Sequence, residues 1–199
     1  PVNLYGATKL SAEKLFLTAK KNHSDSKSKF IVMRYGNVNA SRGSVMPLFI
    51  EKSKSGVLPI THKEMTRFSI SMNEAIEMLM YSIKALDNGQ ILIPKIPSYK
   101  VTDLASIFSK CKIKIIGIRT GEKLHEDLIS SAESSYAVET KKYYILFPNT
   151  DKKKMIQLQK KIKAKKVSVG LIYNSKTNKI FLNKKQLVQI IDAIKKKID

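Results

Sequence analysis

Short apolar runs alternate with amphipathic stretches along this chain. Two runs, 30–33 and 91–93, have the length and composition of strands that are buried on both faces, and the runs at 113–118 and 143–147 predict two more strands. Two shorter runs, 58–60 and 68–70, predict further strands. Helical periodicity or helix-favouring composition predicts helices at 6–20, 43–55, 76–83, 102–108, 152–165 and 184–197. Strands and helices that alternate in this way predict an α/β protein.

The ends and faces of several elements are marked in the sequence. We expect Thr102 to cap the helix at 102–108 and Asn88-Gly89 to close the helix that begins at 76, with a polar loop at 22–28. Two apolar stripes follow helical spacing: Ile76, Leu79, Met80 and Ile83, then Leu187, Ile190, Ile191 and Ile194. The second stripe is expected to be buried, while the lysines around it form a solvated face.

Composition limits the size and setting of the protein. With 199 residues, 43% of them hydrophobic, the chain can form one sizeable core or two small lobes. It contains no run of about 18 apolar residues and no basic-then-apolar leader. Cys111 is the only cysteine, which excludes an internal disulfide and favours a reducing cytoplasm. We expect it to be a packed small residue.

The formal net charge of +21 is typical of proteins that bind nucleic acid or acidic membranes. Its distribution argues against such a partner, because lysines are scattered over every segment and no aromatic ribbon, helix-turn-helix or finger pattern accompanies them. The only arginines are Arg34, Arg42, Arg67 and Arg119, and all four lie in motifs described below. A guanidinium can bind phosphate in a bidentate way that lysine cannot reproduce.

Tyr5 and Lys9 form a candidate acid/base pair. They stand four residues apart in a helix-favouring segment, so the phenol and the ammonium share one face, one turn apart. A nearby cation favours the phenolate, which makes such a tyrosine able to exchange a proton near neutral pH. The same spacing also occurs on purely structural helices, so the chemistry depends on what accompanies it.

Further motifs follow in order: residues 34–45 (RYGNVNASRGSV), 65–68 (MTRF), 94–98 (PKIPS) and 117–126 (GIRTGEKLHE). Together with residues 1–9 (PVNLYGATK), they resemble the extended short-chain dehydrogenase/reductases. More narrowly, they resemble the inverting UDP-N-acetylglucosamine 4,6-dehydratases of the polysaccharide biosynthesis protein family. Membrane-bound retaining relatives carry Met in place of Tyr5, so the tyrosine points to the inverting branch.

This resemblance implies the fold and its division. We expect the C-terminal part of an extended Rossmann fold plus a smaller substrate-binding lobe, with the N-terminal dinucleotide half absent. Residues 1–57 would end the cofactor domain, 58–150 would form mainly the nucleotide-sugar lobe with a returning strand near 90–94, and 151–199 would be a lysine-rich helical extension. The family's G-x-G-x-x-G fingerprint is not found in the chain, and no Thr-Asp-Lys run precedes Tyr5. The chain alone is therefore expected to be inactive.

The resemblance also implies a reaction and the residues that serve it. UDP-N-acetylglucosamine would be dehydrated to a UDP-4-keto-6-deoxy-hexosamine with inversion at C5, using NADP, or NAD as the alternative. Tyr5 would be the acid/base, and Lys9 would hold the nicotinamide ribose. The other cofactor-binding residues would be Val38, Asn39, Ala40, Ser41 and Arg42, with Ala40 standing where the family commonly has Gly. The substrate-binding residues would be Asn37, Val45, Thr61, Arg67, Arg119 and Glu122.

Two other functions stay open: a remnant that binds a UDP-sugar without turnover, and a basic nucleic-acid-binding protein. Arg119 and Glu122 could also be a surface ion pair. No metal is expected, because the three histidines are far apart in sequence, and His125 is taken as structural. The resemblance implies a cytoplasmic homo-oligomer that serves surface-glycan or flagellin sugar synthesis, without a membrane or nucleic-acid partner.

Overall fold

The computed structural model of the chain describes residues 1–22, 28–148 and 152–198. They fall into two compact units, each discontinuous in sequence. Unit 1 comprises residues 1–35, 76–95 and 127–173, and unit 2 comprises residues 36–75, 96–126 and 174–199. Most of the loop expected at 22–28 lies outside the described residues. The expected division by role into 1–57, 58–150 and 151–199 stays a prediction.

Unit 1 is built on a five-stranded sheet in the order β1-β5-β10-β9-β11. These strands are β1 (Val32–Met33), β5 (Ile91–Pro94), β10 (Tyr143–Leu146), β9 (Ala137–Glu139) and β11 (Lys165–Lys166). β1 runs parallel to β5, and the remaining neighbours are antiparallel. All four residues of β5 are buried, as the apolar run at 91–93 predicts. β8 (Asp127–Ile129) pairs with the short β12 (Tyr173–Asn174).

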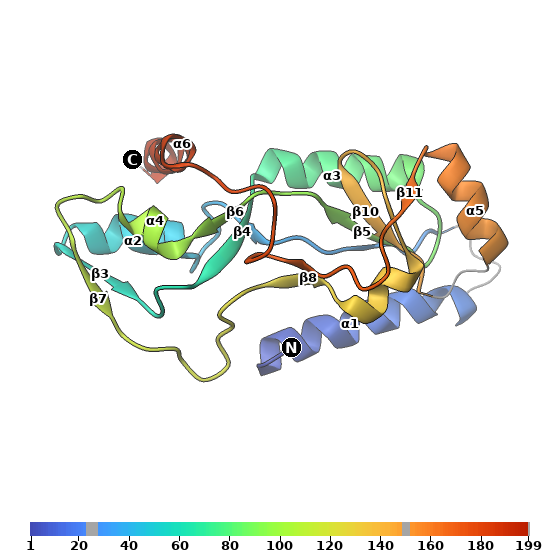
Figure 1. Cartoon of the computed structure of the whole chain (residues 1–199), viewed down its shortest axis with the longest axis horizontal. Coiled ribbons are helices and arrows are strands. Elements are labelled where there is room, and N and C mark those ends of the chain that lie inside the picture. Colours follow the sequence, from blue (N-terminus) through green and yellow to red (C-terminus); the bar gives the residue numbers. More distant parts are fainter. Residues whose placement is uncertain (23–27, 149–151, 199) are drawn as a thin grey trace. The chain divides into compact units, whose positions relative to one another are not determined.

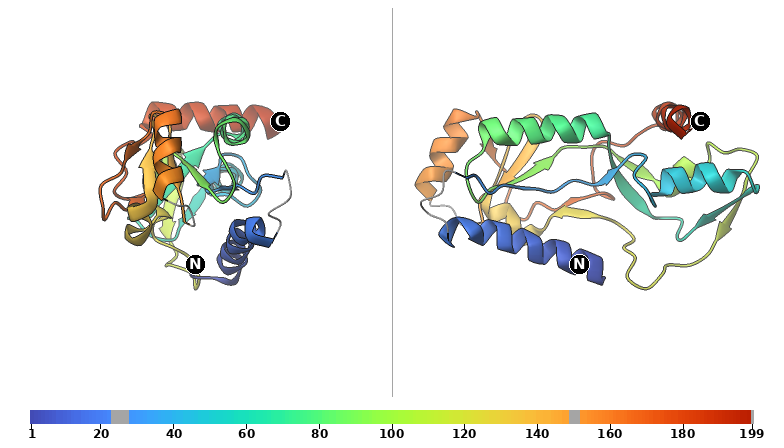
Figure 2. Two further views of the ribbon diagram at one scale, coloured as in Figure 1. Left: turned by 90° about the vertical axis from the view of Figure 1, so that its right-hand side faces the viewer. Right: turned by 180° about the vertical axis from the view of Figure 1, so that it is seen from behind.

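Helices cover the sheet of unit 1. α1 (Leu4–Asn22) and α3 (Met72–Ala85) flank β1 at one edge of the sheet (Figure 2). The 3-10 helix η1 (Ser131–Tyr136) lies beside α1, and α5 (Lys152–Lys161) lies near β11 (Figure 1). One core cluster of the unit contains buried side chains from α3, α5, the sheet and the residues directly after α3 and β10: Met78, Leu86, Leu92, Val138, Ile145, Phe147 and Leu158.

The apolar stripe of α3 does not face this core. Its four members are 42–55% exposed, and they are Ile76, Leu79, Met80 and Ile83. Met78 and Ser82 on another face of the helix are buried instead. Helical periodicity identifies an apolar face, but it does not say which surface of the protein that face meets.

Unit 2 contains two small sheets. β2 (Asn37–Val38), β4 (Thr66–Ile70) and β6 (Ser98–Lys100) form the first, and β3 (Val57–Ile60) runs parallel to β7 (Lys112–Ile115) in the second. Three helices complete the unit: α2 (Val45–Ser53), α4 (Val101–Ala105) and α6 (Lys184–Ile198). The predicted α/β class is thus confirmed in both units.

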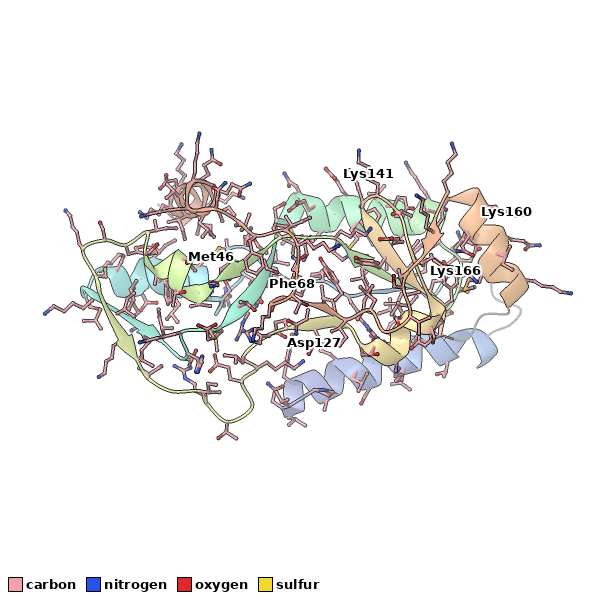
Figure 3. The ribbon with its side chains drawn as sticks, in the orientation of Figure 1. Met46, Phe68, Asp127, Lys141, Lys160 and Lys166 are labelled. Carbon is pink, nitrogen blue, oxygen red and sulfur yellow. The ribbon has the colours of Figure 1, made fainter. Side chains whose placement is uncertain are left out.

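Helix α6 is part of the core of unit 2. Leu187, Ile191 and Ile194 are at most 4% exposed and pack with Met46 and Phe49, while Ile190 is half-buried at the rim. The buried stripe predicted for the last helix is confirmed. Figure 3 marks Met46 and Phe68 in unit 2, and it marks the exposed Lys141, Lys160 and Lys166 on the surface of unit 1.

Several predicted boundaries are wrong. Lys100 rather than Thr102 is the N-cap of α4, because Thr102 already lies inside the helix. The expected strand at 113–118 ends at residue 115, and the expected helix at 152–165 ends at residue 161. Helix and strand ends are set by local capping and pairing, which periodicity does not report. None of the helices in the described ranges is long and apolar enough to cross a membrane.

Candidate functional site

Tyr5 and Lys9 lie in the first turns of α1. The carboxamide oxygen of Asn3 accepts a hydrogen bond from the backbone N–H of Gly6 (2.8 Å), which caps the helix at its start. The ammonium nitrogen of Lys9 is 5.3 Å from the centroid of the Tyr5 ring, and the Tyr5 side chain is 72% exposed. The helical spacing therefore brings the two side chains together on an open surface, within reach of a ligand.

In unit 2, the predicted cofactor-binding residues form β2 and the turn that follows it. Asn37 pairs with Ser69 in the ladder between β2 and β4, and the Asn39 carboxamide accepts a hydrogen bond from the Ser69 hydroxyl (2.8 Å). Gly36 passes so close to Phe68 that an added Cβ would collide with it. This close approach holds the chain against β4 directly before β2 begins.

The turn itself has an unusual backbone. Ala40 has a φ of 65°, in the left-handed region that favours glycine, and Gly43 follows with a φ of 77°. Ser41 and Arg42 are exposed between them, and Ser44 is the N-cap of α2. The glycine that the resemblance implies for the family at this position would suit the conformation of the turn.

An open hollow lies beside this turn, lined by Ala40, Arg42, Gly43, Pro47, Leu48, Glu51, Ile194 and Lys197. Its charged lining residues are two cations, Arg42 and Lys197, and one carboxylate, Glu51, and the first turn of α2 carries no acidic residue. Cations beside a helix N-terminus suit the phosphates of a dinucleotide. The residues present at 38–42 thus fit a phosphate-bearing cofactor.

The predicted substrate-binding residues gather elsewhere in unit 2. The Thr61 hydroxyl, 9% exposed as a residue, donates to a carboxylate oxygen of Glu122 (3.3 Å), and the same oxygen is 3.9 Å from the Arg67 guanidinium. The other Glu122 oxygen accepts a long hydrogen bond from the backbone N–H of Arg119 (3.4 Å). Residues 119–122 form a turn, and the Arg119 side chain is exposed. The structure thus brings together Thr61, Arg67, Arg119 and Glu122.

Arg67 also holds this loop in place. Its guanidinium donates to the carbonyls of Thr66 (2.8 Å), Lys123 (2.9 Å) and Leu124 (3.1 Å), and its side chain is only 11% exposed. Glu126 lies 3.8 Å from its Nε. The sequence suggested only the phosphate-binding role of this arginine, because its carbonyl partners carry no sequence signal.

A buried hydrogen-bond network supports the same loop. The Thr66 hydroxyl bonds to Nδ1 of His125 (2.8 Å) and to the Ser175 hydroxyl (2.7 Å), and Ser175 is fully buried. The backbone N–H of Glu126 also donates to the Ser175 hydroxyl (2.9 Å). His125 thus has structural partners. No group of three or more histidine, cysteine, aspartate or glutamate side chains within the described residues could hold a metal ion.

The remaining predicted residues occupy other positions. Val45 is the first residue of α2 and packs against the core of unit 2, and Val38 is half-buried in β2. All predicted cofactor and substrate residues lie in unit 2 except Tyr5 and Lys9, which lie in unit 1.

Sequence reasoning missed an ion cluster in unit 1. The Arg34 guanidinium donates twice to Glu13 of α1 (2.6 and 2.7 Å), once to Glu133 of η1 (2.7 Å) and once to the Leu128 carbonyl (3.1 Å). Burial would lower the pKa of Arg34, but the two carboxylates outweigh it and raise that pKa. Burial would raise the pKa of Glu133, but hydrogen bonds from Arg34 and Ser130 hold it below its usual value.

Comparison with known proteins identifies the family. A model of the polysaccharide biosynthesis protein family matches residues 1–148. The chain belongs to that family. The resemblance indicated by the motifs is confirmed.

Individual members of the family give closer detail. The chain is 43% identical to UDP-N-acetylglucosamine 4,6-dehydratase (inverting) from Campylobacter jejuni, over 96% of this chain and 60% of that protein. It thus spans about 60% of the length of this curated relative. Among solved structures, Pen from Bacillus thuringiensis is 31% identical with a TM-score of 0.82, and the match covers 98% of this chain and 59% of that one.

A more distant solved structure shows the fold alone. DesIV, a dTDP-glucose 4,6-dehydratase from Streptomyces venezuelae solved with NAD and TYD bound, is 15% identical with a TM-score of 0.55. The match covers 62% of this chain and 41% of that one. The Rossmann-type architecture expected from the motifs is confirmed by these neighbours.

Proposed function

We propose that this chain supplies the catalytic helix and the substrate-binding residues of an NADP-dependent UDP-N-acetylglucosamine 4,6-dehydratase that inverts C5. The observation that carries the proposal is the Tyr5–Lys9 pair, exposed on one face of α1, in a chain 43% identical to an inverting dehydratase. Because that identity spans 60% of the relative, the activity is proposed for the protein that contains this chain.

In this reaction, Tyr5 takes the proton from the sugar 4-hydroxyl. Lys9 favours the phenolate of Tyr5 by its charge and binds the nicotinamide ribose. A nicotinamide cofactor held by Lys9 and residues 38–42 would supply the redox chemistry, so that the hydride lost from C4 would be regained at C6 and the overall reaction would be redox-neutral. Oxidation at C4 acidifies the C5 proton and permits loss of water from C6. The acid/base that inverts C5 is not among the residues assigned in this chain.

The loop cluster of unit 2 suits the diphosphate and the uridine ribose. Arg119 would bind the diphosphate through its exposed guanidinium, while Asn37 would bond nearby. Arg67, whose donors bond to the carbonyls of the loop, would contribute its positive charge to the same diphosphate. Glu122, already held by Thr61, would accept hydrogen bonds from the ribose hydroxyls. Val45 and Thr61 would line the nucleotide-sugar pocket. The grouping of Thr61, Arg67, Arg119 and Glu122 supports these roles.

For the cofactor, we favour NADP over NAD. Residues 38–42 would hold the cofactor. Binding of its phosphates there is supported by the hollow beside these residues, where Arg42 and Lys197 add positive charge. Cytoplasmic residence, a homo-oligomer and a role in surface-glycan or flagellin sugar synthesis complete the proposal.

The first test is a calorimetric titration of the chain with UDP-N-acetylglucosamine at 50 and 200 mM salt, with a random oligonucleotide in parallel. Saturable binding of the sugar nucleotide is expected, weakened at least tenfold by Arg119→Ala and unchanged by Lys141→Ala, an exposed lysine of unit 1. Tight oligonucleotide binding that falls steeply with salt, without any response to the sugar nucleotide, would contradict the proposal.

The second test concerns turnover. The chain alone should give no 4-keto product, because it carries no dinucleotide fingerprint. Fused to the C-terminal end of the N-terminal segment of the Campylobacter jejuni relative and assayed in D2O, the chain should produce the 4-keto sugar with deuterium at C5. Tyr5→Phe should abolish that product while it leaves sugar-nucleotide binding intact. Binding without any turnover in the joined protein would favour a UDP-sugar-binding remnant.

A further inference from the structure

Helix α1 is attached to unit 1 through its second half only. Of the α1 side chains that the structure describes, Leu17 is 5% exposed and the Glu13 side chain 9% exposed, and the Phe16 ring lies 6.3 Å from that of Phe30. Every residue from Leu4 to Ala12 is exposed except Gly6, which is half-buried. Glu13 is therefore the last enclosed contact before the turns that carry Tyr5 and Lys9.

The partner of Glu13 is a rigid one. Arg34 follows directly after β1, and its backbone N–H donates to the Leu92 carbonyl of β5 (2.9 Å). Its planar guanidinium meets both Glu13 oxygens in a two-pronged contact, which fixes orientation as well as distance. The guanidinium also donates to Glu133 and to the Leu128 carbonyl, so three different residues hold it in place.

The spacing along α1 links this contact to Tyr5 and Lys9. Lys9 and Tyr5 precede Glu13 by four and eight residues, so all three follow one another along the helix at one-turn intervals. Tyr5 lies about 12 Å from Glu13 along the helix axis, at 1.5 Å per residue. A tilt of roughly 5° at Glu13 would move Tyr5 by about 1 Å, a displacement that can lower a rate about 100-fold.

We propose that Arg34 is a positioning residue for the dehydratase reaction, which aims the Tyr5–Lys9 helix through its two-pronged contact with Glu13. The inference rests on the proposed function, because it assigns a purpose to the placement of Tyr5. Arg34 thus has a structural role, whereas Arg67 and Arg119 are proposed to act on the diphosphate. The positive charge of Arg34 is paired with Glu13 and Glu133, both in unit 1.

Two matched variants distinguish an effect on the orientation of α1 from a general loss of stability. Glu13→Gln removes the charge that holds α1, whereas Glu133→Gln removes a charge of the same cluster and leaves the contact between Arg34 and Glu13. Both should lower the melting temperature of the 199-residue chain. Only Glu13→Gln should speed amide hydrogen exchange at residues 8–13, by about tenfold or more, because those amides depend on the docking of α1. Glu133→Gln should leave that exchange within about twofold.

The same variants in the protein completed with the N-terminal segment of the Campylobacter jejuni relative give the kinetic result. Glu13→Gln should lower kcat about 10- to 100-fold, with KM for UDP-N-acetylglucosamine within about twofold, because the sugar nucleotide is bound by unit 2. Equal exchange in the two variants, or unchanged kcat in a Glu13→Gln enzyme, would overturn the inference. If no version turns over, the proposed function fails, and the exchange result alone still decides whether Arg34 aims α1.

Discussion

Ala40 is a residue whose backbone conformation disfavours its side chain. Its φ of 65° lies in the left-handed region, where a Cβ costs roughly 1–2 kcal/mol. Ala40→Gly should therefore raise the free energy of unfolding by about 0.5–1 kcal/mol, after the greater freedom of glycine in the unfolded chain is deducted. Urea unfolding measures the change. Ala12→Gly, on the exposed face of α1, is the matched control and should lower stability by about 0.5–1 kcal/mol. A loss of stability in both variants would show that the turn is not left-handed.

Glu133 makes the stability of unit 1 depend on acid pH. Because its pKa is lower in the folded chain than in the unfolded one, it contributes stability above the unfolded pKa of about 4.3, and this contribution is lost as pH falls through the folded pKa. Glu133→Gln should be less stable than the natural chain at pH 7, and the difference should shrink below about pH 4. Chemical unfolding of both chains from pH 7 to pH 3 checks this. A difference that stays constant with pH would show that the carboxylate is not paired.

For single residues, the sequence predicted the pairing of side chains that lie close together in the chain. Tyr5 and Lys9 are one helical turn apart, so their pairing follows from spacing alone. Glu13 and Arg34 are joined across the fold, and Glu133 is far from both in sequence. Their charges gave no sign of the pairing, because a long-range ion pair has no fixed spacing to detect.

At the scale of elements, the two apolar stripes had different outcomes for one reason. The stripe of α6 packs with α2 side chains in a core, whereas that of α3 is exposed on the opposite side from Met78. Both patterns predict a helix correctly, since periodicity depends on the helix itself. The surface that each stripe meets depends on the rest of the fold, which no local pattern contains. The short strands at 98–100, 137–139 and 165–166 were missed because two or three residues are too few for a pattern.

The exposed stripe of α3 should govern self-association. Ile76→Lys combined with Ile83→Lys should leave the free energy of unfolding of the chain within about 0.5 kcal/mol, because both residues are more than half exposed. The same double variant should reduce light scattering at high protein concentration, since large exposed apolar patches promote association. Lys84→Ala with Glu77→Ala, two exposed residues on the same helix, serves as the control and should scatter like the natural chain. Unchanged scattering in the lysine variant would place the association surface elsewhere.

At the scale of the whole molecule, the two units divide the predicted chemistry. Unit 1 carries the exposed Tyr5 and Lys9, and unit 2 carries the residues that suit the sugar nucleotide and the turn that suits the cofactor. The class of fold and the motifs of both units followed from the sequence. Of the interleaved arrangement, only the returning strand near 90–94 was expected, because no local pattern marks residues 127–173 as a further part of unit 1.

That interleaving has a consequence for synthesis on the ribosome. Each unit is assembled from three separate stretches, so unit 1 is incomplete until Tyr173 has emerged, and unit 2 is incomplete until α6 has followed. Ribosomes add about 5–20 residues per second, so residues 174–198 take roughly a few seconds to make. Neither unit is complete before most of the chain has been made. For most of its synthesis, the nascent chain exposes the strands of both cores, and its final helix is the step that completes unit 2.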